Sequence, residues 1–251
     1  MKQTRNLCLL RSISPTLLLF LLPFIQLPSI TCSVAHAGGV ASLAKEQPRQ
    51  AVGSYRGNGA ATELEALSCS AEEIFALAVA GKTDRIGRKL EALKKSVASL
   101  NCLQSQSNNI LLPRLERAVV DLEQAFTARD RLDTMRYANR ITLIAATLEV
   151  PLKTSVPTEV SLLDYHCREL AIWSEAKKKE KLSTIVMRMH LAWQTLMPKL
   201  IEHDGTKELR RFSEIMGRLE TARTPEDYSR LSKQVSPEID TMMALFANPA
   251  K

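Results

Sequence analysis

The sequence predicts an all-α protein, and three observations support this fold class. No stretch alternates apolar and polar residues with β-branched enrichment, so no β-strand is expected. Apolar residues instead recur with helical spacing, in runs of about four turns separated by short polar breaks. Aromatic residues make up only 5% of the chain, which leaves Leu, Ile, Val, Met and Ala to build the core.

The first 37 residues have the order of an export signal. Three basic residues precede an apolar run at 17–30, and Ala35-His36-Ala37 offers the small residues that a signal peptidase reads. The apolar run is too short, and too often interrupted by proline, for a membrane span. We therefore interpret 1–37 as a cleaved signal peptide, with a lipoprotein signal at Cys32 as the alternative. The mature protein is then periplasmic or secreted, with no stable membrane span after cleavage.

The segment that follows the signal has a different composition. Five of the nine glycines lie at 38–61, with almost no periodic apolar residues. Such a segment buries too little apolar surface to offset the entropy of ordering it, so we predict a flexible tether. The rest of the chain is long enough for one large core or two small ones.

Within that remainder, a degenerate repeat is visible. Each repeat has a helical run, a polar break and a second helical run, and the breaks lie at 81–84, 128–130, 176–180 and 222–225. The landmark residues Leu77, Leu122, Leu170 and Leu219 are spaced by 45, 48 and 49 residues. Regular spacing of this kind indicates repeated helical hairpins.

The chemistry of the breaks favours turns over kinks. Gly81 can end a helix, and Thr83 can cap the next one. At the fourth break, Thr224 is a good N-cap and Pro225 suits the first helical position. The apolar stripe also shifts by nearly half a turn across this break, which one continuous helix would not produce. We therefore predict separate antiparallel helices.

Longer loops at 101–109, 150–157 and 202–206 separate the repeats. The loop at 150–157 carries two prolines and divides the chain into helical unit 1 (62–150) and helical unit 2 (159–247). Two hairpins in each unit predict two tandem up-and-down four-helix bundles. The alternative is one long four-helix bundle with interrupted helices. In unit 2 we expect buried positions at Leu170, Trp173, Trp193, Leu196, Leu219, Leu231 and Ile239.

Two turn sequences, FALAVAGK at 75–82 and LETARTPED at 219–227, resemble the inter-helix turns of the small periplasmic b-type cytochromes and their haem-free relatives. That family holds haem b between a methionine early in its first helix and a histidine late in its fourth. In unit 2 the resemblance implies the exchanged pair His166 and Met243. Because Met243 is equally explained as a core residue, we predict no cofactor.

One helical face carries a second pair of candidate ligands. Met187 and His190 lie three residues apart, and thioether with imidazole suits copper(I). Methionine also fills irregular bundle cores, which is the interpretation we favour. No metal site is therefore predicted, and His203, between two acidic residues, is assigned to the surface.

The three cysteines after the signal are expected to meet an oxidising compartment. If the chain turns near Lys82, Cys69 and Cys102 both lie at the open end of the first hairpin. We predict a disulfide between them, with Cys69–Cys167 as the alternative.

No catalytic motif is present in the sequence. H-E-x-x-H, G-x-S-x-G and phosphate-binding glycine loops are all missing. Carboxylates such as Glu72, Glu73 and Glu91 have the spacing of solvated helix faces. Three of the seven net positive charges lie in the signal, and no basic patch with aromatics remains for nucleic acid. The sequence therefore predicts a non-catalytic binding or interaction module for a periplasmic protein or small ligand; the alternative is a metal- or haem-binding carrier.

Overall fold

The computed structural model describes residues 50–104, 110–149 and 156–247. These residues contain eight α-helices, which confirms the all-α prediction, and none of the eight is both long and apolar enough to cross a bilayer. The signal peptide lies outside the described residues. The helices are α1 (Gln50–Val79), α2 (Ile86–Gln104), α3 (Leu111–Thr127), α4 (Arg131–Glu149), α5 (Thr158–Glu175), α6 (Lys179–Glu202), α7 (Thr206–Thr221) and α8 (Pro225–Ala247), with a 3-10 turn at Thr83–Arg85.

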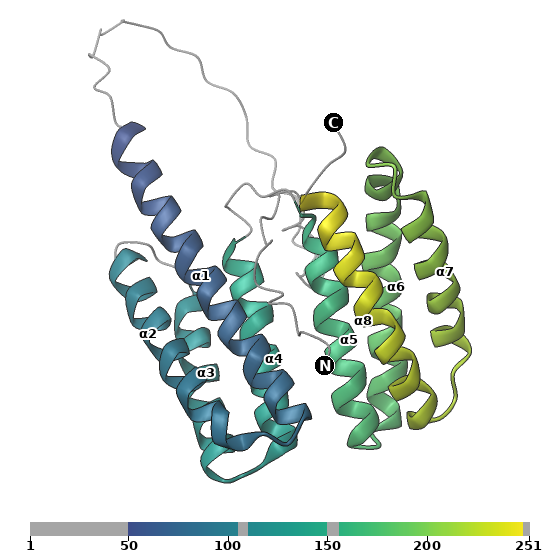
Figure 1. The fold of residues 1–251 in the computed structure, drawn as a ribbon, viewed down its shortest axis with the longest axis horizontal. Helices are drawn as coiled ribbons and strands as arrows, with labels where there is room; N and C mark the ends of the chain where they lie inside the picture. Colours follow the sequence, from purple (N-terminus) through teal and green to yellow (C-terminus); the bar gives the residue numbers. More distant parts are fainter. Residues whose placement is uncertain (1–49, 105–109, 150–155, 248–251) are drawn as a thin grey trace, which may run out of the picture.

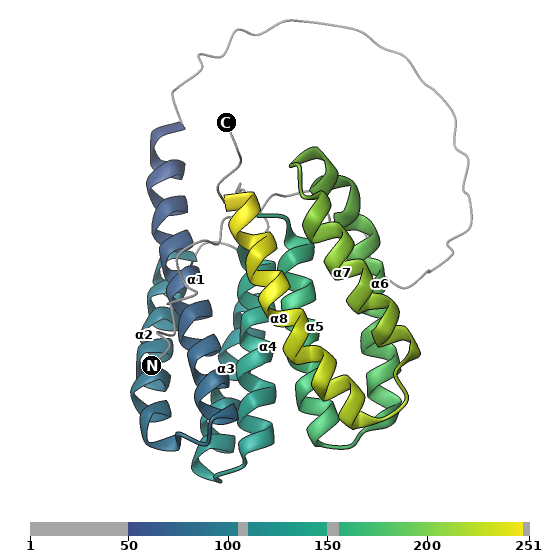
Figure 2. The ribbon, with the colours of Figure 1, turned by 45° about the vertical axis from the view of Figure 1, so that its right-hand side comes forward.

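Successive helices run antiparallel and pack into two contact groups, α1–α4 and α5–α8. Figure 1 shows the groups side by side, with α4 and α5 adjacent between them and the four tight turns at one end. The same side-by-side arrangement is visible in the turned view (Figure 2). The predicted boundary at 150–157 falls between α4 and α5, largely outside the described residues.

Each group buries its own apolar cluster. The α5–α8 cluster is built on leucine, isoleucine, methionine and aromatics that include Trp193 and Phe212, whose ring centroids lie 4.6 Å apart. Six of the seven positions expected to be buried in unit 2 are buried: Leu170, Trp193, Leu196, Leu219, Leu231 and Ile239. The seventh, Trp173, is half-buried because it lies between the groups and packs against both clusters.

The breaks in the repeat are turns, as predicted. At the end of α1, Lys82 N–H donates to the Leu77 carbonyl and Gly81 N–H donates to the Ala78 carbonyl. The same six-to-one and five-to-two pattern ends α3, α5 and α6. This is the Schellman motif, which requires one residue with positive φ after the helix. Gly81 meets that requirement at the first turn, with φ of 68°.

At three of these turns a non-glycine residue, Arg129, Lys177 or Asp204, takes the position that glycine would favour. Arg129 and Lys177 have φ values of 57° and 53°, and both are exposed. A left-handed conformation costs a non-glycine residue about 1–2 kcal/mol. Glycine avoids this cost, but it loses more conformational entropy on folding, which cancels part of the gain. We expect Arg129→Gly and Lys177→Gly each to raise the free energy of unfolding by about 0.5–1 kcal/mol, measured by urea titration. Gly81→Ala is the converse control and should lower it; a loss of stability in either glycine variant would contradict the prediction.

The turn before α8 differs from the other three and matches its predicted cap. Asp227 N–H donates to Thr224 Oγ1 at 3.1 Å, while Thr224 Oγ1 donates to the Asp227 carboxylate at 2.6 Å. Pro225 occupies the first position of α8. The Tyr228 hydroxyl then donates to the Ala222 carbonyl at 3.0 Å, which fixes the extended turn against α8.

Part of the predicted tether is helical. Residues 50–61 form the start of α1 rather than a flexible segment, whereas 38–49 lie outside the described residues. Ala60, Leu64 and Leu67 follow helical spacing and are buried, so the first helix of unit 1 extends back into this segment. Once this packed stretch is helical, extending it toward the N-terminus requires no new nucleus, so glycine-containing turns can be added to it.

The predicted Cys69–Cys102 disulfide is not formed, because Cys102 is an exposed thiol. An ion pair between Glu73 of α1 and Lys89 of α2 sets the register of the hairpin. Cys69 lies four residues from Glu73 along α1, toward the open end of the hairpin. Cys102 lies thirteen residues from Lys89 along α2 in the same direction. The nine-residue difference separates them by about 13 Å along the helix axes. The loop predicted at 101–109 would absorb this mismatch if it began at Asn101, but α2 remains helical to Gln104.

The alternative pairing with Cys167 is not formed either. Cys167 is a buried thiol of α5, and its Sγ donates to the Ser232 carbonyl of α8 at 3.2 Å. Burial raises the pKa of this thiol well above its usual range. Because the thiolate is the reactive form, Cys167 is expected to be chemically inert and to serve as a packing residue.

Candidate functional site

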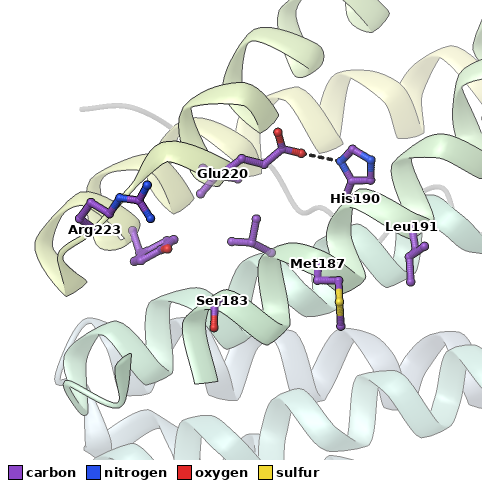
Figure 3. Close-up of a pocket in the computed structure, with 9 residues that line it drawn as sticks. Ser183, Met187, His190, Leu191, Glu220 and Arg223 are labelled. Carbon is purple, nitrogen blue, oxygen red and sulfur yellow. Dashed lines mark hydrogen bonds and ion pairs between the residues drawn. The ribbon is translucent and has the colours of Figure 1, made fainter. Parts of the chain in front are cut away.

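A depression of about 380 Å³ lies between α6 and α7 near the turn end of the second group. We call it the α6–α7 groove. Figure 3 shows its walls, with α6 on one side and α7 and the following turn on the other. The lining residues are Ser183, Val186, Met187, His190 and Leu191 of α6, Leu219 and Glu220 of α7, Arg223 of the turn, and Tyr228 of α8.

The periodicity of α6 explains why one wall of the groove is apolar. The core-facing stripe of α6 includes Leu182, Met189 and Leu196, all fully buried. Met187 and Leu191 fall outside this stripe and are four residues apart, so they share a different face. Their exposed fractions are 59% and 57%, and Figure 3 shows both side chains on the same flank of α6.

The floor of the groove is formed by buried side chains from three helices. Val186, Leu219 and Tyr228 line it, and all three are buried. The Tyr228 ring is held in place by the hydroxyl bond to the α7–α8 turn. A floor fixed by core packing gives the groove a preformed shape, as is usual for binding sites.

A hydrogen bond from His190 to Glu220 spans the groove. His190 Nδ1 lies 2.5 Å from Glu220 Oε1, and His190 Nε2 lies 2.7 Å from the Gln194 amide nitrogen (Figure 3 shows the bond to Glu220). An amide nitrogen only donates, so Nε2 accepts and the ring proton sits on Nδ1. In this arrangement Nδ1 donates to Glu220. Both ring nitrogens are engaged, and the pair connects α6 to α7.

Arg223 supplies the one unpaired charge of the groove within the described part of the chain. Its guanidinium has no hydrogen bond or ion pair with any described side chain, and Figure 3 shows it at the turn end of the groove. Guanidinium presents five donors in a planar fork that matches carboxylate geometry. The groove thus combines an apolar floor with an available cationic group.

The structure places both candidate copper ligands, Met187 and His190, along the groove but does not bring them together into a metal site. Met187 and His190 both line the groove, yet Met187 lies on a different flank of α6 from the imidazole (Figure 3). Glu220 and Gln194 already engage both nitrogens of His190. No group of three His, Cys, Asp or Glu side chains with metal-binding geometry occurs among the described residues.

His166 of α5 and Met243 of α8, the two residues implied as haem ligands, are both buried but lie at different levels along the helices. His166 lies beside Cys167, which contacts Ser232, whereas Met243 is eleven residues beyond Ser232. Eleven residues correspond to about 16 Å of helix. His166 packs edge-on against Tyr165, with ring centroids 5.1 Å apart, and its Nδ1 is buried without a partner. Burial and the Arg188 charge lower the pKa of His166 to about 4.

A polar cluster that was not predicted from the sequence lies between the two helix groups. Arg168 of α5 pairs with Asp164 at 2.5 Å and with Glu72 of α1 at 3.4 Å, and it donates to Thr142 of α4 at 3.3 Å. Asp240 of α8 interacts electrostatically with Asp164, Arg168 and Glu72. We call these five residues the junction cluster. Glu72 was predicted on a solvated face, but its side chain is only 16% exposed.

Further contacts hold α4 against α5 beside the junction cluster. The Asn139 amide donates to the Tyr165 carbonyl and to Glu169, each at 3.1 Å. Glu169 in turn accepts from the Trp173 indole at 2.7 Å. The other two carboxylates grouped with Glu72 behave as predicted, because Glu73 and Glu91 are 41% and 66% exposed.

No protein-family model, curated protein or solved structure matches the chain. The likeness to b-type cytochromes therefore remains confined to the two turn sequences, and the structure supports an all-helical fold of eight described helices without a family. The groove and the junction cluster are consequently defined by geometry alone.

Proposed function

We propose that the protein is an exported, non-catalytic interaction module, built as two tandem up-and-down four-helix bundles, that binds a segment of a partner protein in the α6–α7 groove. The observation that carries this proposal is the apolar strip of Met187 and Leu191, which continues the floor of the groove onto the surface of α6. An exposed apolar strip beside a preformed hollow is typical of a protein interaction site.

The chemistry of the groove supports binding over catalysis. Its one histidine is held by Glu220 and Gln194, and its serine, Ser183, has no hydrogen bond to a base among the described side chains. A nucleophile needs a base within hydrogen-bond reach, which Ser183 lacks. The junction cluster links helices rather than lining a pocket, so it supports a structural role.

The proposal predicts that one charge placed on the groove wall abolishes binding of an apolar probe. We expect Leu191→Glu to reduce the fluorescence enhancement of 1-anilinonaphthalene-8-sulfonate at least about fivefold, because a carboxylate would have to be desolvated at the site. Ile201→Glu is the matched control, since Ile201 is also on α6 and 63% exposed but lies outside the groove. Equal losses in the two variants, or no enhancement by the wild type, would contradict the proposal.

The alternative function is a metal- or haem-binding carrier, and the shared position of Met187 and His190 in the groove is the observation that favours it. Protein purified from the periplasm separates the two functions. A Soret absorbance band or stoichiometric copper would support the carrier, whereas a colourless, metal-free protein that binds the probe would support the interaction module.

A further inference from the structure

We propose that the groove receives an amphipathic helix of a partner protein, and that this helix carries a carboxylate at the end of its apolar face that meets Arg223. The inference rests on the proposed function and names the partner's shape and charge. Three features of the described residues support it: the linear apolar strip, the unpaired guanidinium, and the saturated His190–Glu220 pair.

The shape of the apolar surface favours a rod over a small molecule. Met187 and Leu191 are about 6 Å apart along the axis of α6, so the strip runs parallel to the helix. The hollow itself, at about 380 Å³, is near the lower limit for small-ligand pockets and is open to solvent along the strip. A helix laid in such a groove would insert apolar side chains at i and i+4, which matches the spacing of the strip.

The charges of the groove determine the polarity of the partner. His190 and Glu220 are hydrogen-bonded to each other, whereas Arg223 has no partner among the described side chains. Arg223 lies at the turn end, where Lys178 and Lys179 of the α5–α6 turn also lie. A carboxylate arriving at this end would form a charge-assisted pair with Arg223 in a partly desolvated site. Among the residues that line the groove, Arg223 is the one lysine or arginine.

A second copy of the chain fits the groove less well than an acidic helix does. Through a two-fold axis, the same face presents Met187, Leu191 and another Arg223. Two guanidinium groups would then share the interface, and the one groove carboxylate of each copy, Glu220, already accepts from His190, so the second copy brings no free carboxylate to Arg223. An acidic partner removes this repulsion and uses the cation.

The test is a selection from a displayed library of helical peptides with leucine fixed at i and i+4 and all flanking positions randomised. The full mature chain is the bait, and its Leu191→Glu variant is used for counter-selection. We expect recovered peptides to be enriched in Asp or Glu at one end. For the best peptide, Arg223→Glu should weaken binding by roughly tenfold or more in fluorescence anisotropy, and replacing the peptide carboxylate with lysine should restore binding to Arg223→Glu.

Arg210→Glu is the matched control, because Arg210 is exposed on α7 outside the groove and its replacement makes the same change in net charge. Recovery of groove-dependent peptides without acidic enrichment, or equal effects of the two arginine variants, would overturn this inference and leave the proposed function intact. Failure to recover any peptide that discriminates against Leu191→Glu would overturn the proposed function itself. Dodecanoate binding more tightly than every selected peptide, or a Leu191-dependent dimer in sedimentation, would overturn the helix as occupant.

Discussion

Replacement of Arg168 by methionine should lower the free energy of unfolding by about 3–5 kcal/mol, the cost typical of breaking a buried ion pair by removing one partner. The side chain of Arg168 is 15% exposed, and those of Asp164 and Glu72 are 11% and 16% exposed. Without the guanidinium, these two carboxylates and Asp240 would share a largely buried site with no compensating cation.

The direction of the effect follows from the charge balance of the junction cluster. Burial alone would lower the pKa of Arg168, but Asp164 and Glu72 outweigh it, so the pKa is raised and the guanidinium is held in its charged form. A methionine fills the space of the arginine's aliphatic stem but cannot neutralise the carboxylates. The loss is therefore electrostatic and should shrink when the carboxylates are protonated at acidic pH.

Chemical denaturation followed by circular dichroism measures this loss, with Arg230→Met as the control. Arg230 pairs with Asp227 at 2.7 Å, but its side chain is 66% exposed, and surface pairs of this kind contribute about 0–1 kcal/mol. A loss in Arg168→Met no larger than that in Arg230→Met would show that the junction cluster does not stabilise the fold. Because Glu72 and Arg168 belong to different helix groups, we also expect the variant to unfold less cooperatively.

The helices were predictable because their signals are local. Gly81, Thr224 and Pro225 each act within a few residues, and the structure places a turn at each. The start of α1 was not predictable from composition, because its glycine-containing turns extend a helix that is stabilised further along by Ala60 and Leu64. A tertiary contact thus overrode a local preference.

The sites were less predictable because they join residues distant in the sequence. Met187 and His190 were recognised as a pair on one helix, but the partner that engages the histidine, Glu220, is thirty residues away on α7. Glu72 has the spacing of a solvated residue, and its buried partner Arg168 belongs to the other helix group. Helical periodicity reports which face a residue occupies, but it does not report which helix covers that face.

The buried His166 and the half-buried Asp240 should give opposite contributions to the pH dependence of wild-type stability between about pH 4 and 6. Burial, together with the Asp164 charge, raises the pKa of Asp240 to about 6, although Arg168 acts in the opposite direction. Burial and the Arg188 charge lower the pKa of His166 to about 4. Their ordinary values are 3.8 and 6.5, so the two shifts cover nearly the same pH range in opposite directions.

The signs of the two contributions are opposite. Asp240 binds its proton more tightly in the folded state, so its contribution to stability is largest below about pH 4 and is lost as the pH rises through 6. His166 binds its proton more tightly in the unfolded state, so its contribution is smallest near pH 4 and is gained as the pH rises to about 6.5. In the wild type the two slopes offset each other.

Removing either group should therefore expose the slope of the other. We expect the free energy of unfolding of Asp240→Asn to rise with pH across this window, and that of His166→Phe to fall with pH, each by about 1–2 kcal/mol after allowance for partial solvation. Urea titrations at pH 4, 5, 6 and 7 measure the difference between each variant and the wild type, which cancels the titration of other carboxylates. The double variant should recover a flat difference profile. If both single variants instead changed slope in the same direction, the assignment of opposite proton affinities to Asp240 and His166 would be wrong.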